Sequence, residues 1–108
     1  MLTKKKIIIP IFEYPIKVII FDNWEEVSSI FSMPPSRGTV VDYSDYSIIA
    51  VRSKFPATLV HESYHLTNSV WRFIGYTPER DNDEVTAYLQ TYIYNKLNEV
   101  FEKHWKNK

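Results

Sequence analysis

The chain has 108 residues, of which 44% are hydrophobic and 24% charged, and its thirteen basic residues balance thirteen acidic ones. This size and composition predict one globular domain spanning residues 1–108, and the absence of net charge gives no indication of binding to nucleic acid or to an anionic membrane surface. The chain has no cysteine, which excludes disulfides, thiolate ligands and a cysteine nucleophile, so a metal site has to use histidines and carboxylates.

The N-terminal region is apolar but interrupted. Residues 6–21 are rich in Ile, Val, Phe and Tyr, and prolines at positions 10 and 15 divide them, which predicts two short strands with the prolines at strand ends or on an edge. Because Glu13 and Lys17 interrupt the apolar run and no small-residue cleavage site follows, we expect neither a secretory signal nor a membrane span. These features favour a cytoplasmic protein.

A short helix and a hairpin are predicted next. Asp22 or Asn23 can cap a short helix whose apolar residues recur at helical spacing. Residues 36–38 are predicted to be a loop. The β-branched runs 39–43 and 46–52 flank a polar turn and therefore predict a β-hairpin.

Two longer helices complete the chain. The first is predicted from about Pro56, with Ser53 as its candidate cap, to Ile74, where Gly75 ends it. The second is predicted over residues 83–106 from an apolar stripe with helical spacing. This order of elements predicts an α+β domain, with a small antiparallel or mixed sheet and the two helices packed on one of its faces.

The first long helix contains the sequence His61-Glu62-Ser63-Tyr64-His65. On an α-helix His61 and His65 lie about 40° apart and one turn from each other, so both imidazoles can reach one ion. Glu62 falls about 60° to the side, where its carboxylate can reach a metal-bound water without being a ligand. Since zinc lowers the pKa of a bound water to about 7, this arrangement suits metal-assisted hydrolysis. It predicts Zn²⁺ ligands at His61 and His65 and a general base at Glu62.

Two histidines leave such a site one ligand short, because catalytic zinc usually has three protein ligands and an open position. The candidates for the third ligand are His104, Asp81, Asp83 and Glu84. His104 is predicted near the frayed end of the last helix, which makes it a poor ligand. Glu84 is favoured because it lies in the first turn of that helix, which the preceding loop can fold back antiparallel to the motif helix.

These residues also carry a family resemblance. The histidines, Glu62 and Glu84, with eighteen residues between His65 and Glu84, resemble the HExxH-x18-E pattern of gluzincins, the zincin metallopeptidases whose third zinc ligand is a glutamate. Residues 83–87 are similar to the NExxA element of zinc aminopeptidases and to the ExxA element of small mobile-element metallopeptidases that act on repressors. The resemblance spans about residues 39–100. It implies a zincin-like fold, a Zn²⁺ cofactor, peptide-bond hydrolysis, and a phage or mobile-element origin.

The resemblance further implies how a substrate binds. In zincins the strand just before the active helix forms a sheet edge to which an extended substrate adds, and residues 46–52 stand in that place. We therefore expect a protein or peptide substrate along an edge strand 46–52, bound by a monomer or by a homodimer that completes the cleft. The chain has no GxMEN-type element for holding a substrate amine, which favours an endopeptidase.

Two tyrosines are candidates for assisting the reaction. Tyr88 stands where thermolysin-like enzymes have an aspartate and shares a helical face with Glu84, so it is a candidate catalytic residue that orients a ligand or donates to the oxyanion; the alternative is a core tyrosine. Tyr76, in the loop between the helices, is a second candidate for the oxyanion.

Two alternatives to an enzyme remain. The chain could be a zincin-derived metal-binding module that recruits a protein without catalysis. It could also be a metal-free interaction domain, in which the polar face that includes both histidines is solvated surface.

Overall fold

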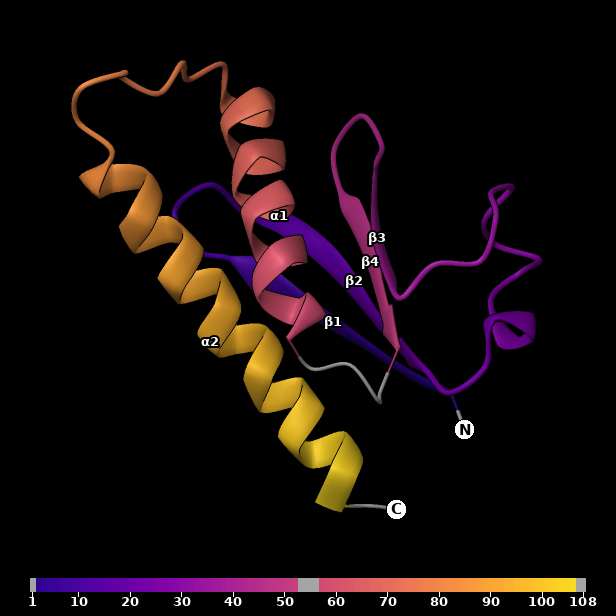
Figure 1. The fold of residues 1–108 in the computed structure, drawn as a ribbon. Helices are drawn as coiled ribbons and strands as arrows, with labels where there is room; N and C mark the ends of the chain where they lie inside the picture. The colour runs from indigo at the N-terminus through magenta and orange to yellow at the C-terminus, as the bar shows by residue number, and fades with distance from the viewer. Residues whose placement is uncertain (1, 53–56, 107–108) are drawn as a thin grey trace.

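The chain is described here from a computed structural model that covers residues 2–52 and 57–106. The described residues form a mixed α+β domain (Figure 1). In chain order its elements are strands β1 (Thr3–Ile9) and β2 (Tyr14–Phe21), the 3₁₀ helix η1 (Trp24–Glu26), strands β3 (Gly38–Asp42) and β4 (Ser47–Arg52), and helices α1 (Thr58–Ile74) and α2 (Glu84–Lys106).

The four described strands form one sheet in the order β1-β2-β4-β3. The outer pairs, β1 with β2 and β3 with β4, are antiparallel, whereas the central pair, β2 with β4, is parallel. The strand that follows the hairpin turn, β4, therefore lies inside the sheet, hydrogen-bonded on both sides. The expectation that residues 46–52 form a sheet edge is wrong, and the edge on that side is β3.

The two predicted N-terminal strands and the hairpin are confirmed. Pro10 follows β1 directly, whereas Pro15 is the second residue of β2 and stands opposite Ile8. Gly38, expected in a loop, is the first residue of β3. Each strand alternates between the two faces of the sheet, so β3 presents Gly38, Val40 and Asp42 on one face.

The helix predicted after residue 22 is only one 3₁₀ turn, η1. Its start is nevertheless capped, because the Glu26 carboxylate accepts hydrogen bonds from the backbone N–H groups of Asp22 (2.8 Å) and Asn23 (3.1 Å). Val27 and Phe31, which follow the turn, are buried against the face of the sheet opposite the two α-helices.

Both α-helices cover the other face of the sheet, as predicted. Helix α1 lies on β3 and β4, and α2 lies on β1 and β2 (Figure 1). The core between them is made by apolar residues from both helices and three strands, among them Ile16, Ile20, Ile49, Leu59, Leu66, Val70, Ile93, Leu97 and Phe101. None of the described helices combines the length and apolar character that a membrane span requires.

The helix ends determine how α1 and α2 meet. Gly75 ends α1 in the left-handed conformation, with φ of 75°, and α2 starts at Glu84, close to the predicted residue 83. The predicted start at Pro56 and cap at Ser53 lie outside the described residues. After the intervening loop α2 runs back antiparallel to α1 (Figure 1), and the Trp71 indole N–H donates to the Thr86 hydroxyl at 3.1 Å.

A candidate metal site on helix α1

The motif residues lie in the first half of α1 and gather at one place. One ligand atom from each of His61, Glu62 and His65 can be chosen so that all three lie within 4.8 Å of one another. Both histidines are exposed, whereas Glu62 is 4% exposed. The site therefore combines two accessible imidazoles with a buried carboxylate.

The imidazole geometry fits a metal ion. The Nε2 atoms of His61 and His65 lie 3.2 Å apart. Two nitrogen ligands about 2.0–2.1 Å from a tetrahedral Zn²⁺ are separated by about 3.3–3.4 Å, so the ion would need almost no change in the distance between these rings. Without an ion, one Nε2 can donate a hydrogen bond to the other, and a metal ion would take the place of that shared proton.

Glu62 lies between the histidines and strand β3. Burial raises the pKa of the Glu62 carboxyl above its usual value, and the charges on His61 and His65 lower it by less. Among the described residues no group donates a hydrogen bond to this carboxylate. A carboxylate whose pKa is raised accepts a proton more readily than an ordinary glutamate, which suits a general base.

A shallow hollow lies beside the motif. It has a volume of about 450 Å³ and is lined by Ser36, Arg37, Gly38, Ala57, Thr58, His61 and Glu62. The hollow joins the start of β3 to the first turns of α1. A molecule bound in it would contact His61 and Glu62 directly.

The structure does not bring Glu84 to the histidines. Glu84 is exposed at the start of α2 and lies outside the group formed by the three motif residues. Helix α2 packs on α1 through Trp71, which follows His65 by six residues and so lies about 120° around the helix from it. Consequently α2 contacts a different flank of α1 from the one that carries the histidines.

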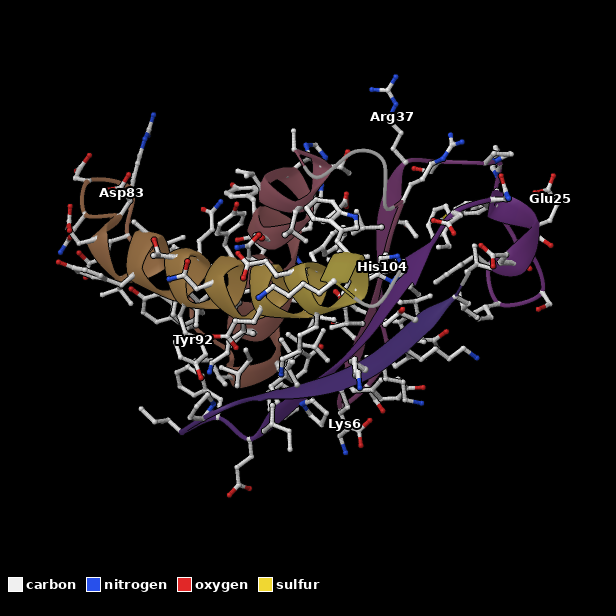
Figure 2. All side chains as sticks on the ribbon, turned by 90° about the horizontal axis from the view of Figure 1, so that it is seen from below. Lys6, Glu25, Arg37, Asp83, Tyr92 and His104 are labelled. Carbon is white, nitrogen blue, oxygen red and sulfur yellow. The ribbon has the colours of Figure 1, made fainter. Side chains whose placement is uncertain are left out.

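The loop carboxylates and His104 also lie elsewhere. Figure 2 shows Asp83 at the left end of the molecule and well apart from Arg37, which lies at the top of this view and borders the hollow. Asp81 is exposed in the same loop as Asp83. His104 is buried near the end of α2, where its Nδ1 is hydrogen-bonded to the Thr3 hydroxyl.

The tyrosine candidates are not at the motif. Tyr88 is 73% exposed on α2, and in the described part of the chain it has no hydrogen bond or ring contact with the motif residues. Tyr76 packs its ring against Trp71, with 4.7 Å between ring centroids. In this structure neither phenol is placed to donate to an oxyanion at His61 and His65.

Sequence reasoning missed the contribution of β3. The Asp42 carboxylate accepts hydrogen bonds from Ser47 (2.8 Å), Ser69 (2.6 Å) and Arg72 (2.6 Å), and so links the end of β3 to α1. Burial raises the pKa of the Asp42 carboxyl, but the hydrogen bonds from Ser69, Arg72 and Ser47 together outweigh burial and hold that pKa below its usual value. The available signal was strand alternation, which places Gly38 and Asp42 on the same face as the partly buried Val40.

No family model, curated protein or solved structure matches this chain. The resemblance to gluzincins therefore depends on the motif positions alone, and the functional argument depends on the geometry around them.

Proposed function

We propose that this chain is a minimal, zincin-like, zinc-dependent endopeptidase in which His61 and His65 hold the ion and Glu62 is the general base. The observation that carries the proposal is the 3.2 Å separation of the two Nε2 atoms beside a buried carboxylate that has no hydrogen-bond donor among the described residues. A carboxylate with a raised pKa beside two imidazoles and an open hollow is typical of a functional site.

The residues divide the chemistry between them. A bound Zn²⁺ would supply Lewis acidity, which polarises a scissile carbonyl and makes a water molecule more acidic. Glu62 takes the proton from the attacking water and then delivers it to the nitrogen of the leaving amine, so that the carboxylate is regenerated at the end of the cycle. The two histidines act as neutral ligands throughout.

The substrate we propose is an extended protein segment at the outer edge of β3. In the described part of the chain β3 pairs with β4 alone, which leaves the backbone groups on its other side able to pair with an added strand. Gly38 in β3 adjoins Glu62, so a peptide along this edge would pass the base. This proposal replaces the substrate edge expected at residues 46–52.

The proposed zinc site has two possible compositions, which differ in the residue that provides the third ligand. Glu84 remains the candidate from the sequence, and its recruitment requires the first turn of α2 to move toward the histidines. Alternatively, the carboxylate already beside them, Glu62, is itself a ligand. In that case the chain is the metal-binding interaction module without catalysis, because the base is occupied.

The substitution Glu62→Gln separates these functions. Zinc content is measured after purification without added metal and again after zinc titration, together with hydrolysis of an unfolded protein substrate. If Glu62 is the base, Glu62→Gln keeps its zinc affinity within about threefold and loses about 100-fold or more of its hydrolysis. If Glu62 is a ligand, zinc affinity falls by about tenfold or more.

The matched control is Glu99→Gln, which changes an exposed glutamate on α2. It should alter neither zinc affinity nor hydrolysis. Binding of less than about 0.2 equivalents of zinc by the wild-type chain after titration would refute both versions of the metal site.

A further inference from the structure

Strand β3 comes closest to the motif helix at Gly38. A Cβ atom built on Gly38 would lie 2.7 Å from Cγ2 of Thr58 and 3.1 Å from Cγ of Glu62. It would also lie 3.4 Å from Oε2 of Glu62. Contacts below 3.0 Å between a Cβ and another heavy atom essentially do not occur in proteins. Position 38 therefore has no room for a side chain unless α1 or its side chains move.

Lack of space, not backbone conformation, explains the glycine. Gly38 lies outside the left-handed region, so other residues can adopt its backbone angles. The other glycine of the chain shows the reverse case, since Gly75 has φ of 75° but no heavy atom within 4 Å of a built Cβ. The two glycines thus meet separate requirements, space at position 38 and conformation at position 75.

We propose that Gly38 is a positioning residue for the general base. The missing side chain leaves the space in which the Glu62 carboxylate lies beside His61 and His65, and it lets β3 run close to that carboxylate. This inference rests on the proposed function, because it treats Glu62 as the general base. It identifies the space left at Gly38 as the reason that the Glu62 carboxylate can lie where it does.

A side chain at position 38 can act in two ways. It can push the Glu62 side chain out of its position, or it can push β3 away from α1 through the methyl group of Thr58. Both displacements change the distance between the base and a substrate on the β3 edge. Misplacement of a catalytic group by about 1 Å can cost on the order of 100-fold in rate.

Thr58→Ser separates the two contacts. Replacing Thr58 by serine removes Cγ2, the atom nearest to the built Cβ, but leaves the 3.1 Å contact with Glu62 unchanged. In the double variant Gly38→Ala/Thr58→Ser, the strand can keep its place on α1 while the added methyl still presses on Glu62. The double variant should regain stability without regaining activity.

The experiment uses the full chain with four variants: Gly38→Ala, Thr58→Ser, the double variant, and Gly75→Ala as the matched glycine control. Zinc affinity, kcat and KM on an unfolded protein substrate, and thermal unfolding are measured for each. The ¹³C chemical shift of the Glu62 carboxyl carbon is recorded in the metal-free protein, which provides a measurement independent of activity.

We expect Gly38→Ala to lower kcat by about 10- to 100-fold, to leave zinc affinity within about threefold, and to shift the Glu62 carboxyl resonance. The double variant should unfold near the temperature of Thr58→Ser but keep the low kcat and the shifted resonance. Gly75→Ala should unfold at a lower temperature, because alanine is strained at positive φ, with kcat and the Glu62 resonance unchanged.

Two results would overturn the inference. One is a double variant whose kcat returns to that of Thr58→Ser, which would show that only strand packing had been disturbed. The other is an unchanged Glu62 resonance in Gly38→Ala. If the wild-type chain hydrolyses no substrate, the proposed function fails, and the carboxyl resonance of the metal-free variants still decides whether Gly38 positions Glu62.

Discussion

The environment of Glu62 predicts an effect on stability as well as on catalysis. In the metal-free protein Glu62 is 4% exposed, and no described residue donates a hydrogen bond to its carboxylate. Burial raises its pKa, so the ionised form at neutral pH destabilises the folded state. Glu62→Gln removes the charge and keeps the shape. We expect the free energy of unfolding at pH 7 to rise on the order of 1 kcal/mol, measured by urea denaturation with a chelator present.

The stability difference between Glu62→Gln and wild type should also depend on pH, and this dependence is the control for the prediction. A group whose pKa is raised by folding contributes stability that is present below its unfolded pKa and is lost as the pH rises through the folded value. The advantage of Glu62→Gln should therefore shrink as the pH falls toward 4, where wild-type Glu62 is protonated. A Glu62→Gln variant that is no more stable than wild type at pH 7 would contradict the described burial.

Individual residues also show what the sequence could predict. His61, Glu62 and His65 lie within five consecutive positions of one helix, so helical periodicity alone predicted their proximity, and the structure confirms it. Gly38 lies more than twenty residues before them, and its proximity depends on how β3 packs on α1. Strand alternation places Gly38 on the same face as Val40, but no local pattern in the sequence shows that Gly38 lies against Glu62.

At the scale of elements, hydrogen bonds to Asp42 tie strand β3 to helix α1. Because its pKa is lowered by folding, Asp42 contributes stability that is present above its usual pKa of 3.8 and is lost as the pH falls through the lower folded value. Asp42→Asn should therefore be less stable than wild type at pH 6, and the difference should narrow as the pH falls below about 4. Chemical denaturation at several pH values measures this.

The control for Asp42→Asn is Asp45→Asn, because Asp45 is exposed in the turn after β3. Asp45→Asn removes a carboxylate from the turn but none of the hydrogen bonds that Asp42 accepts, so it should not reproduce the destabilisation of Asp42→Asn. The ion pair between Arg72 and Asp42 is largely exposed, with 64% and 34% of the two side chains accessible, so most of the effect should come from the hydroxyl groups of Ser47 and Ser69. Equal pH profiles for Asp42→Asn and wild type would contradict this assignment.

The hydrogen bond between α1 and α2 can report whether Glu84 becomes a zinc ligand. If Glu84 becomes the third ligand, the first turn of α2 has to move, which disturbs the hydrogen bond from Trp71 to Thr86. We expect zinc to shift the ¹⁵N indole resonance of Trp71 in the wild type but not in Glu84→Ala, and we expect Glu84→Ala to bind zinc at least about tenfold more weakly. Glu79→Ala, in the exposed loop, is the control.

A Glu84→Ala variant with wild-type zinc affinity would instead limit the site to His61, Glu62 and His65. The sequence could not resolve this point. The sequence predicted correctly that the two helices are antiparallel. The flank on which they meet, however, depends on which apolar residues pack together. Here Trp71 places α2 on a flank about 120° from His65.

The order of strands shows the same limit. The two antiparallel pairs join neighbours in sequence and follow from turns and apolar patterns. The parallel pairing of β2 with β4 joins residues 16–21 with residues 47–52 and has no local signal. The edge expected at residues 46–52 came from the resemblance to zincins, and no local pattern in the sequence showed that β4 lies inside the sheet.

For the whole molecule, zinc binding should be visible as stabilisation. The two histidines are placed together by the folded helix, so an ion held by them favours the native state. At a free zinc concentration of about 100 times Kd, the free energy of unfolding should rise by about 2.7 kcal/mol. Thermal or chemical denaturation with and without zinc measures the change. The double variant His61→Ala/His65→Ala should show none, and an equal rise in that variant would place the ion elsewhere.

The two edges of the sheet differ in their lysine content, which bears on the proposed binding of an extended segment. Strand β1 carries Lys4, Lys5 and Lys6, and lysines on an edge strand oppose pairing with another chain. Strand β3, with the sequence GTVVD, has no lysine. Addition of an extended protein segment is therefore favoured at β3, the edge beside Glu62.

The parallel pairing of β2 with β4 also has a consequence for the order of folding. The ligand pair His61 and His65 needs only one helical turn, which forms in about a microsecond or less. The position of Glu62 against Gly38 needs β3 docked on α1, and β3 reaches the sheet through β4, whose pairing with β2 closes a long loop. The relative positions of the two imidazoles therefore depend on local structure alone, whereas the position of Glu62 depends on contacts that form late. With the proposed function, hydrolysis would require the completed sheet, so the chain would be inactive while its own unfolded segments are exposed to cleavage.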